Sequence, residues 1–266
     1  NPTQAMKIGP GELLRSGLDS TVIGRYLPLE AVTTYSIGSR LTTFLIQFMV
    51  SISGVLDPRF ARLAGSEEKE TLQRMFLDAM AILTSMSSII GLALIWEGQA
   101  LIRLWVGEGF DDAYSVLVIL TAGHILAAAQ MPSISLLFAM NKHRFPALFA
   151  VLEGSMNLGL SVLFVGRWGI KGVAIGTLIP MVLFKALVLP IYTSRVTGID
   201  LGRIMSRFLR PAAAVGAPGL LLIFLARPTS VGWPAFFVLG LVFIGGMAIW
   251  TNYAGLGAGH RLDLRP

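Results

Sequence analysis

Long apolar runs dominate this sequence and limit the folds that it can adopt. Each is about 20 residues long, and at 1.5 Å per helical residue this length matches the roughly 30 Å hydrocarbon core of a bilayer. The runs are continuous and lack the ten-residue alternation of a transmembrane β-barrel, so helices are expected. The eight predicted spans are 9–28, 35–56, 76–96, 113–140, 145–166, 172–194, 211–227 and 233–253.

The composition excludes several other classes of protein. Only 14% of the residues are charged, against about 25% in ordinary soluble domains. The absence of cysteine excludes a disulfide scaffold. The net charge of +6 does not indicate nucleic-acid binding, because the basic residues form short clusters between apolar runs rather than one face. We therefore expect an all-α membrane protein with about eight transmembrane helices.

The connections between the runs predict an orientation. Of the 21 Lys and Arg residues, 13 fall on one side of the expected membrane, 5 on the other and 3 within spans. By the positive-inside rule the first side is cytoplasmic, so we expect a multi-pass protein of the inner (plasma) membrane with both chain ends in the cytoplasm. Within 58–75, Ser66 is expected to cap a short surface helix that has Glu67 and Glu68 in its first turn. Because Asn1-Pro2 directly precedes a span, without an initiator Met, we also expect a fragment of something longer.

Polar side chains recur at three- and four-residue steps inside three spans, which places each set on one helical face. The sets are Glu12, Arg15, Asp19 and Tyr26; Ser36, Arg40, Thr43, Gln47 and Ser51; and Glu153, Asn157 and Ser161. Charges within a bilayer cost several kcal/mol, so such faces are expected to border a water-filled cavity or a partner. Snorkelling of Arg15 and Arg40 towards an interface is the alternative, as is a structural Arg15–Asp19 pair.

Two further features of the spans yield specific expectations. Glu153 and Lys185 lie 8 and 9 residues from the cytoplasmic ends of consecutive antiparallel spans, at depths of roughly 12 and 13 Å. A buried ion pair is predicted, with a lone Lys185 facing a cavity as the alternative. Gly172 and Gly176 match the small-residue packing motif, and Pro132 is expected to kink or end the overlong fourth span.

Several functional motifs do not occur in the sequence. There is no phosphate-binding G-x-x-x-x-G-K-[ST] loop, so the chain is not expected to hydrolyse ATP itself. No H-E-x-x-H motif is present, and the three histidines are scattered, which argues against zinc. No nucleophile–base arrangement stands out either. We expect neither a catalytic residue nor a metal or other cofactor.

The order of these features resembles the second half of the polysaccharide-exporter flippases, the O-antigen transporter type of the multidrug/oligosaccharidyl-lipid/polysaccharide superfamily. The resemblance covers about residues 11–195. It is carried by LDSTVIGRYLPLEAVTTYSIGSRL from Leu18 to Leu41, by PRFARL from Pro58, by LWVGEGF from Leu104, and by Asn157-Leu158 followed by WGIKGVA from Trp168.

The resemblance implies a fourteen-span transporter of two six-helix bundles with two extra helices. Residues 1–195 would form the second bundle, and 196–266 a cytoplasmic linker, the extra pair and a short tail. The implied substrate is a polyprenyl-pyrophosphate-linked oligosaccharide, flipped across the inner membrane with ion coupling. Implied partners are the lipid bilayer, the N-terminal six-helix half and the polysaccharide polymerase machinery, without nucleic acid.

The resemblance also implies roles for the polar faces. Arg15, Arg40 and then Lys185 would face the anionic substrate; Thr43, Gln47 and Asn157 would bond sugar hydroxyls; Asp19 or Glu153 would take the coupling proton or sodium ion. Three alternatives remain at this point. One is a drug-cation antiporter of the same superfamily, which the intramembrane basic residues disfavour. The others are a membrane-embedded enzyme acting on lipid-linked sugars, which would need catalytic residues on a large external loop, and a non-functional remnant.

Overall fold

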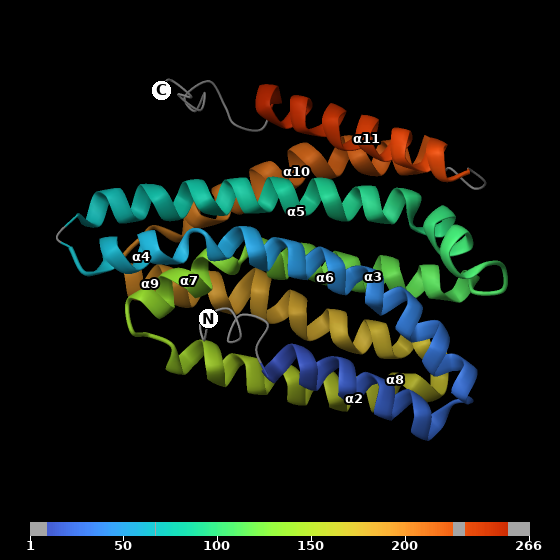
Figure 1. Ribbon diagram of the computed structural model, residues 1–266. Coiled ribbons are helices and arrows are strands. Elements are labelled where there is room, and N and C mark those ends of the chain that lie inside the picture. Colours follow the sequence, from blue (N-terminus) through green and yellow to red (C-terminus); the bar gives the residue numbers. More distant parts are fainter. Residues whose placement is uncertain (1–9, 67, 226–231, 255–266) are drawn as a thin grey trace.

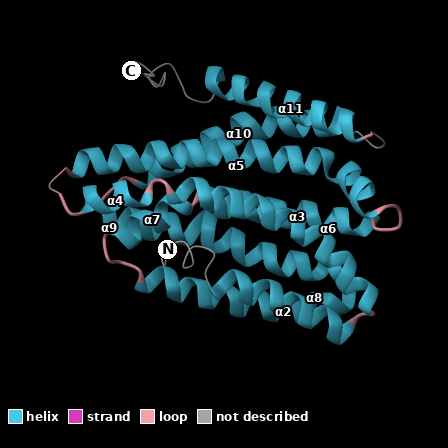
Figure 2. Ribbon diagram, viewed as in Figure 1, coloured by secondary structure: helices cyan, strands magenta, loops and turns pink. Residues whose placement is uncertain are grey.

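The computed structural model describes residues 10–66, 68–225 and 232–254, and within those ranges every regular element is a helix (Figures 1 and 2). The side chains of 10–16 and 252–254 lie outside the described part. The elements are α2 (Pro10–Tyr26), α3 (Leu29–Gly54), α4 (Asp57–Ala64), α5 (Lys69–Val106), α6 (Asp111–Ala129), α7 (Met131–Ala139), α8 (Arg144–Met181), the π-helix η1 (Val182–Val188), α9 (Leu189–Thr197), α10 (Leu201–Leu225) and α11 (Trp233–Ala254).

Each predicted span falls largely on helix, which confirms the all-α class, but the count of eight remains a prediction. By length and apolar composition, five helical segments of the described chain qualify as membrane spans, or six if the bent α3–α4 pair counts as one. One qualifying segment, Arg144–Thr197, contains two of the predicted spans. Helix α2 is not among the qualifying segments, because it has only 17 residues and several of them are ionisable.

The chain reverses direction within α8, at Gly169. The backbone of Gly169 has φ 58° and ψ −139°, a conformation that costs a residue with a side chain considerable strain. Beyond the reversal the second arm returns along the first. A Cβ on Gly172 would lie 2.4 Å from the Phe164 carbonyl oxygen, and one on Gly176 would lie 2.7 Å from the Ser161 nitrogen. The predicted close packing at these two glycines is confirmed, and α8 is a tight antiparallel hairpin.

Proline residues break or distort the helical backbone at two further places. The predicted break in the fourth span is confirmed, since α6 ends at Ala129 and α7 begins at Met131 with Pro132 in its first turn. In the second arm of the hairpin, Pro190 has no N–H to donate to the carbonyl four residues earlier. The preceding turns, Val182–Val188, are wound as a π-helix that carries Lys185.

The prediction of a short helix capped by Ser66 is wrong. Helix α4 ends at Ala64, before Ser66, and the next helix, α5, begins at Lys69 and continues through the predicted third span. Pro58 in the first turn of α4 favours a helix start almost three turns earlier than expected. The Ser66 hydroxyl accepts the Glu68 N–H at 3.3 Å and donates to the Leu63 carbonyl, so it bridges the two helices.

Helix α5 lies at the centre of the packing. It contacts α6 on one side and both α10 and α11 on another, while α3 packs on α6 and α2 packs on α8 (Figure 1). The pair α10 and α11 therefore lies on the far side of α5 from α2 and the α8 hairpin. Its outer face carries exposed apolar side chains, including Leu221, Phe224 and Leu241. Such a surface is suited to lipid.

Candidate functional site

A buried polar cluster joins α2, α3 and both arms of the α8 hairpin around the Asp19 carboxylate. Tyr35 of α3 donates its hydroxyl to Asp19 Oδ2 at 2.6 Å. Asn157 of the first hairpin arm donates from Nδ2 to Asp19 Oδ1 at 3.2 Å. The Thr177 hydroxyl of the second arm lies 3.1 Å from Asp19 Oδ2. Three neutral donors thus surround a carboxylate that is only 4% exposed.

The second ring of this cluster fixes the orientation of the Asn157 amide. Ser161 donates its hydroxyl to Asn157 Oδ1 at 2.9 Å, which leaves the Nδ2 group directed at Asp19. The Thr177 hydroxyl also lies 3.0 Å from Asn157 Oδ1, and its single proton can serve only one of its acceptors at a time. A change in the protonation of Asp19 would therefore require Thr177 and its neighbours to redistribute their hydrogen bonds.

The predicted ion pair between Glu153 and Lys185 is confirmed. Lys185 Nζ lies 3.1 Å from Glu153 Oε2, and the two side chains are 15% and 1% exposed. Since Glu153 belongs to the first arm of the hairpin and Lys185 to the π-helix of the second, the pair joins the arms one turn of helix away from Asn157. An ion pair this deep is costly to form and costlier to break, because removing one partner leaves a buried charge.

The polar residues of α8 thus form one line, as predicted, but the line faces the interior of the hairpin. Glu153, Asn157 and Ser161 are all buried. Asn157 is fully buried and its amide is occupied by Asp19, so in this conformation it does not line an open cavity. Its contact with sugar hydroxyls stays a prediction that would require the hairpin to separate from α2.

The polar face of α3 differs from the polar line of α8, because most of its side chains are exposed. Arg40 and Gln47 are exposed, and Thr43 between them is half-buried with its hydroxyl donated to the Ser39 carbonyl at 2.9 Å. Two large apolar side chains on the same face, Phe44 and Phe48, are 57% and 52% exposed. These five residues define the α3 face, and all of them except Thr43 are exposed.

Only part of the first predicted polar face lies within the described side chains. Asp19 lies in the cluster described above, whereas the side chain of Arg15 lies outside the described residues. The predicted Arg15–Asp19 pair and the substrate contact of Arg15 therefore remain predictions.

Sequence reasoning did not single out Tyr35 or Thr177 as site residues. Tyr35 lies 16 residues from Asp19 along the chain and Thr177 lies 158 residues away, so no local spacing signals the contact. The available signal was weak: Tyr35 directly precedes Ser36, the first residue of the predicted polar set in its span, and Thr177 follows Gly176, whose close packing was predicted.

Long apolar helices tied together by buried polar contacts define the class of this chain as a multi-pass α-helical membrane protein. Residues 12–163, more than half of the chain, match the MatE family. The chain belongs to the MatE family, and its resemblance to the polysaccharide-transporting members is confirmed by the relatives that follow.

Three curated relatives share part of this sequence. The putative O-antigen transporter of Shigella flexneri is 25% identical over 181 residues, covering 66% of this chain and 41% of the relative. The probable low-salt glycan biosynthesis flippase Agl15 of Haloferax volcanii is 23% identical over 169 residues, covering 63% and 35%. The uncharacterized membrane protein EpsK of Bacillus subtilis is 27% identical over 115 residues, covering 42% and 23%. The chain therefore spans less than half the length of these relatives.

A solved structure shows the same fold. It is described as the lipid II flippase MurJ in an inward closed conformation, and it superposes with a TM-score of 0.69 at 15% sequence identity. The superposition covers 94% of this chain and 52% of the other. At this identity the match shows the helical arrangement and nothing about the substrate.

Proposed function

We propose that this chain is part of a flippase that moves a polyprenyl-pyrophosphate-linked oligosaccharide from the inner to the outer leaflet of the plasma membrane. The observation that carries the proposal is the exposed Arg40 in the middle of an apolar helix. Arg40 lies roughly 16 and 21 Å from the two ends of α3, far from either interface for a helix that spans the bilayer. A guanidinium at that depth is tolerated where it meets water, an anion or a partner.

The chemistry of the α3 face suits such a substrate. A guanidinium binds phosphate oxygens through paired N–H groups, and Gln47 about two turns away offers both a donor and an acceptor for sugar hydroxyls. Phe44 and Phe48 leave an apolar surface beside them. An exposed cation disfavours the alternative of a drug-cation antiporter, since that activity calls for an acidic cavity. The names of the relatives support a transporter rather than an enzyme.

The proposal assigns complementary roles to the rest of the molecule. Residues 1–195 form one six-helix bundle, and the open α3 face meets a second, N-terminal six-helix bundle across a water-filled cavity. Residues 196–266 add the linker and the outer helix pair. Rocking of the bundles would expose the cavity to each leaflet in turn. Both chain ends lie in the cytoplasm in this arrangement, and the polymerase machinery that uses the flipped glycan is a partner.

Ion coupling is the second part of the proposal. Asp19 is the stronger candidate for the coupling proton or sodium ion, because its donors come from α3 and from both arms of the α8 hairpin and would rearrange with its charge. Glu153 is the weaker candidate, because Lys185 already neutralises it at 3.1 Å. For the same reason Lys185 would reach substrate only after the pair opens.

A flipping assay tests the role of Arg40. The protein is produced from its own gene and reconstituted in proteoliposomes with a fluorescent lipid-linked oligosaccharide, and the fraction that reaches the opposite leaflet is measured over time. Arg40→Ala is expected to reduce the rate about tenfold or more, which corresponds to the loss of one charge-assisted contact with phosphate. Arg167→Ala, which removes an exposed arginine at the hairpin reversal, is the matched control and should leave the rate within about twofold. Full activity of Arg40→Ala would remove Arg40 from the site.

A further inference from the structure

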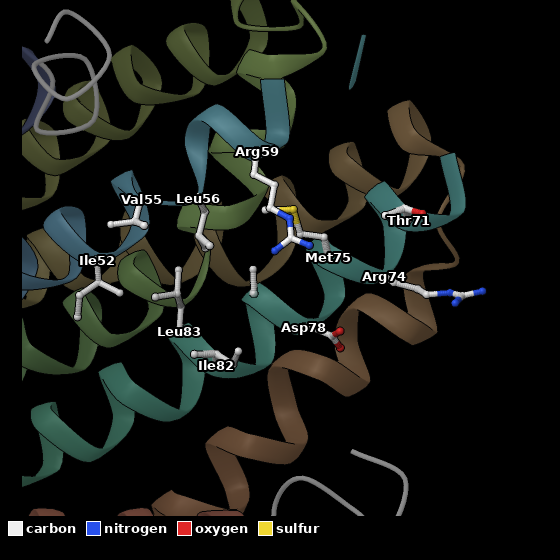
Figure 3. Close-up of a pocket in the computed structure, with 11 residues that line it drawn as sticks. Ile52, Val55, Leu56, Arg59, Thr71, Arg74, Met75, Asp78, Ile82 and Leu83 are labelled. Atoms are coloured by element: carbon white, nitrogen blue, oxygen red, sulfur yellow. The ribbon is translucent and has the colours of Figure 1, made fainter. Parts of the chain in front are cut away.

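A hollow of about 590 Å³ lies where α3 ends, bounded by α4 and the first turns of α5 (Figure 3). Its volume is in the range of sites that bind small molecules. None of the five residues that define the α3 face lines it. No role for it follows from the function proposed above.

One wall of the hollow is apolar. Ile52 lines it from the last turn of α3, Val55 and Leu56 from the connection to α4, and Ile82 and Leu83 from α5. Figure 3 shows these side chains gathered on one side of the hollow, with Arg59 and Asp78 towards the other. The hollow is therefore amphipathic, with an apolar half and a charged half.

The charged half carries one uncompensated positive charge. Asp78 lies 3.7 Å from Arg207 of α10, and Arg74 lies 3.2 Å from Glu70 and extends away from the hollow in Figure 3. Within the described residues, the Arg59 guanidinium has neither an ion pair nor a hydrogen bond, and it extends towards the hollow. Arg59 would therefore provide the counter-charge for an anionic ligand, since Arg207 already forms an ion pair with Asp78.

The hollow lies beside a short helix whose exposed side is basic. Helices α3 and α4 qualify as a membrane span only together, and the chain bends by 42° where they meet. Helix α4 buries Phe60 and Leu63 and leaves Arg59 and Arg62 exposed, so its exposed side is basic, as expected beside anionic lipid headgroups. The apolar half of the hollow then faces the hydrocarbon side, and Arg59 lies at the level of phosphates.

We propose that this hollow is a binding site for a phosphate-headed membrane lipid. The phosphate is held by Arg59, and the first part of the hydrocarbon chain lies against Ile52, Ile82 and Leu83. A phosphate without a chain would gain only the contact with Arg59. The proposal does not depend on flipping activity, because no residue of the α3 face lines the hollow and the test measures binding.

Lipid titration followed by native mass spectrometry tests the proposal on the purified full chain in detergent. Phosphatidylglycerol, undecaprenyl phosphate and inorganic phosphate are titrated separately, so that the source of the phosphate can be distinguished. We expect saturable binding of one lipid of either kind, and the lipid with the higher affinity identifies the source. Inorganic phosphate at the same concentration should neither bind nor displace it.

Three variants locate the site. Arg59→Gln should weaken lipid binding about tenfold, as expected for the loss of a charge-assisted contact. Ile82→Trp fills the apolar half while keeping Arg59, and should weaken binding to a similar extent. Arg62→Gln, on the same helix but outside the hollow, carries the same charge change and should stay within about twofold of the wild type. Unchanged binding in Arg59→Gln, an equal loss in Arg62→Gln, or equal affinity for inorganic phosphate would overturn the proposal.

Discussion

Two charged side chains in the α8 hairpin show how burial decides the cost of a substitution. Glu153 is 1% exposed and its counter-charge, Lys185, is 15% exposed. Their attraction acts where water screens little, and so does the penalty for separating them. Either residue without the other therefore lowers the stability of the protein, although the pair is tolerated.

A double-mutant cycle on this pair gives the first prediction. Lys185→Met leaves the Glu153 carboxylate buried without its cation and is expected to destabilise the protein by about 3 kcal/mol. Adding Glu153→Gln should restore most of that loss, because no buried charge remains. The free energy of unfolding in a detergent titration provides the measurement. Additive effects of the two substitutions would refute a direct interaction.

The Asp19 cluster gives the second prediction. Tyr35→Phe deletes the hydroxyl that donates to Asp19 Oδ2 at 2.6 Å and fills almost the same volume. A hydrogen bond to a buried charged group contributes about 1.5–3 kcal/mol, so a loss of that size in unfolding free energy is expected. Tyr26→Phe, which changes a 55% exposed tyrosine near the end of α2, should alter stability by less than about 0.5 kcal/mol. Equal stability of the two variants would contradict the assigned role of Tyr35.

At the scale of helices, close approach of backbones holds α3 against α6. A Cβ added to Gly38 of α3 would lie 2.5 Å from the Ala113 carbonyl oxygen and 3.1 Å from the Leu117 nitrogen. Both atoms belong to the backbone of α6 and cannot move without shifting the helix. The α3 face on the other side of the helix is positioned by this contact.

The third prediction follows from this contact. Gly38→Ala should force α3 away from α6 and destabilise the protein by about 1–3 kcal/mol, despite the better helix propensity of alanine. Gly154→Ala in α8 is the control, because a Cβ there meets nothing within 4 Å. The control should be neutral or stabilise by up to about 1 kcal/mol. Thermal unfolding of the two variants in one detergent separates the outcomes, and a more stable Gly38→Ala would show that the helices are farther apart than described.

The sequence predicted the helices better than it predicted their ends. Apolar runs of about 20 residues identify spans because the backbone in lipid has few alternatives to helix. The segment around Ser66 has no such constraint, and its capping signal pointed to a helix start where α4 has already ended. The break before Pro132 was predictable, because a missing N–H acts locally.

At the scale of the whole molecule, periodicity identified polar faces but not what they face. Arg40 and Gln47 on α3 and Glu153 and Asn157 on α8 follow the same three- and four-residue rule. The first two are exposed and the last two are buried. Which neighbour covers a face depends on contacts between distant parts of the chain, such as Asn157 with Asp19, 138 residues apart. Only Glu153 and Lys185 could be paired in advance, because a tight reversal joins their spans at matched depths.

Photocrosslinking on the α3 face tests the central claim of substrate contact most directly. Phe44, 57% exposed on that face, is replaced by p-benzoylphenylalanine, a change that keeps its aromatic ring. Illumination with a radiolabelled polyprenyl-pyrophosphate-linked oligosaccharide in native membranes should label the protein at this position. Excess unlabelled lipid-linked oligosaccharide should suppress the labelling. The same replacement at Phe224, 88% exposed on α10, should give no labelling that the unlabelled compound suppresses. Absence of suppressible labelling at Phe44, or equal labelling at both positions, would contradict the account.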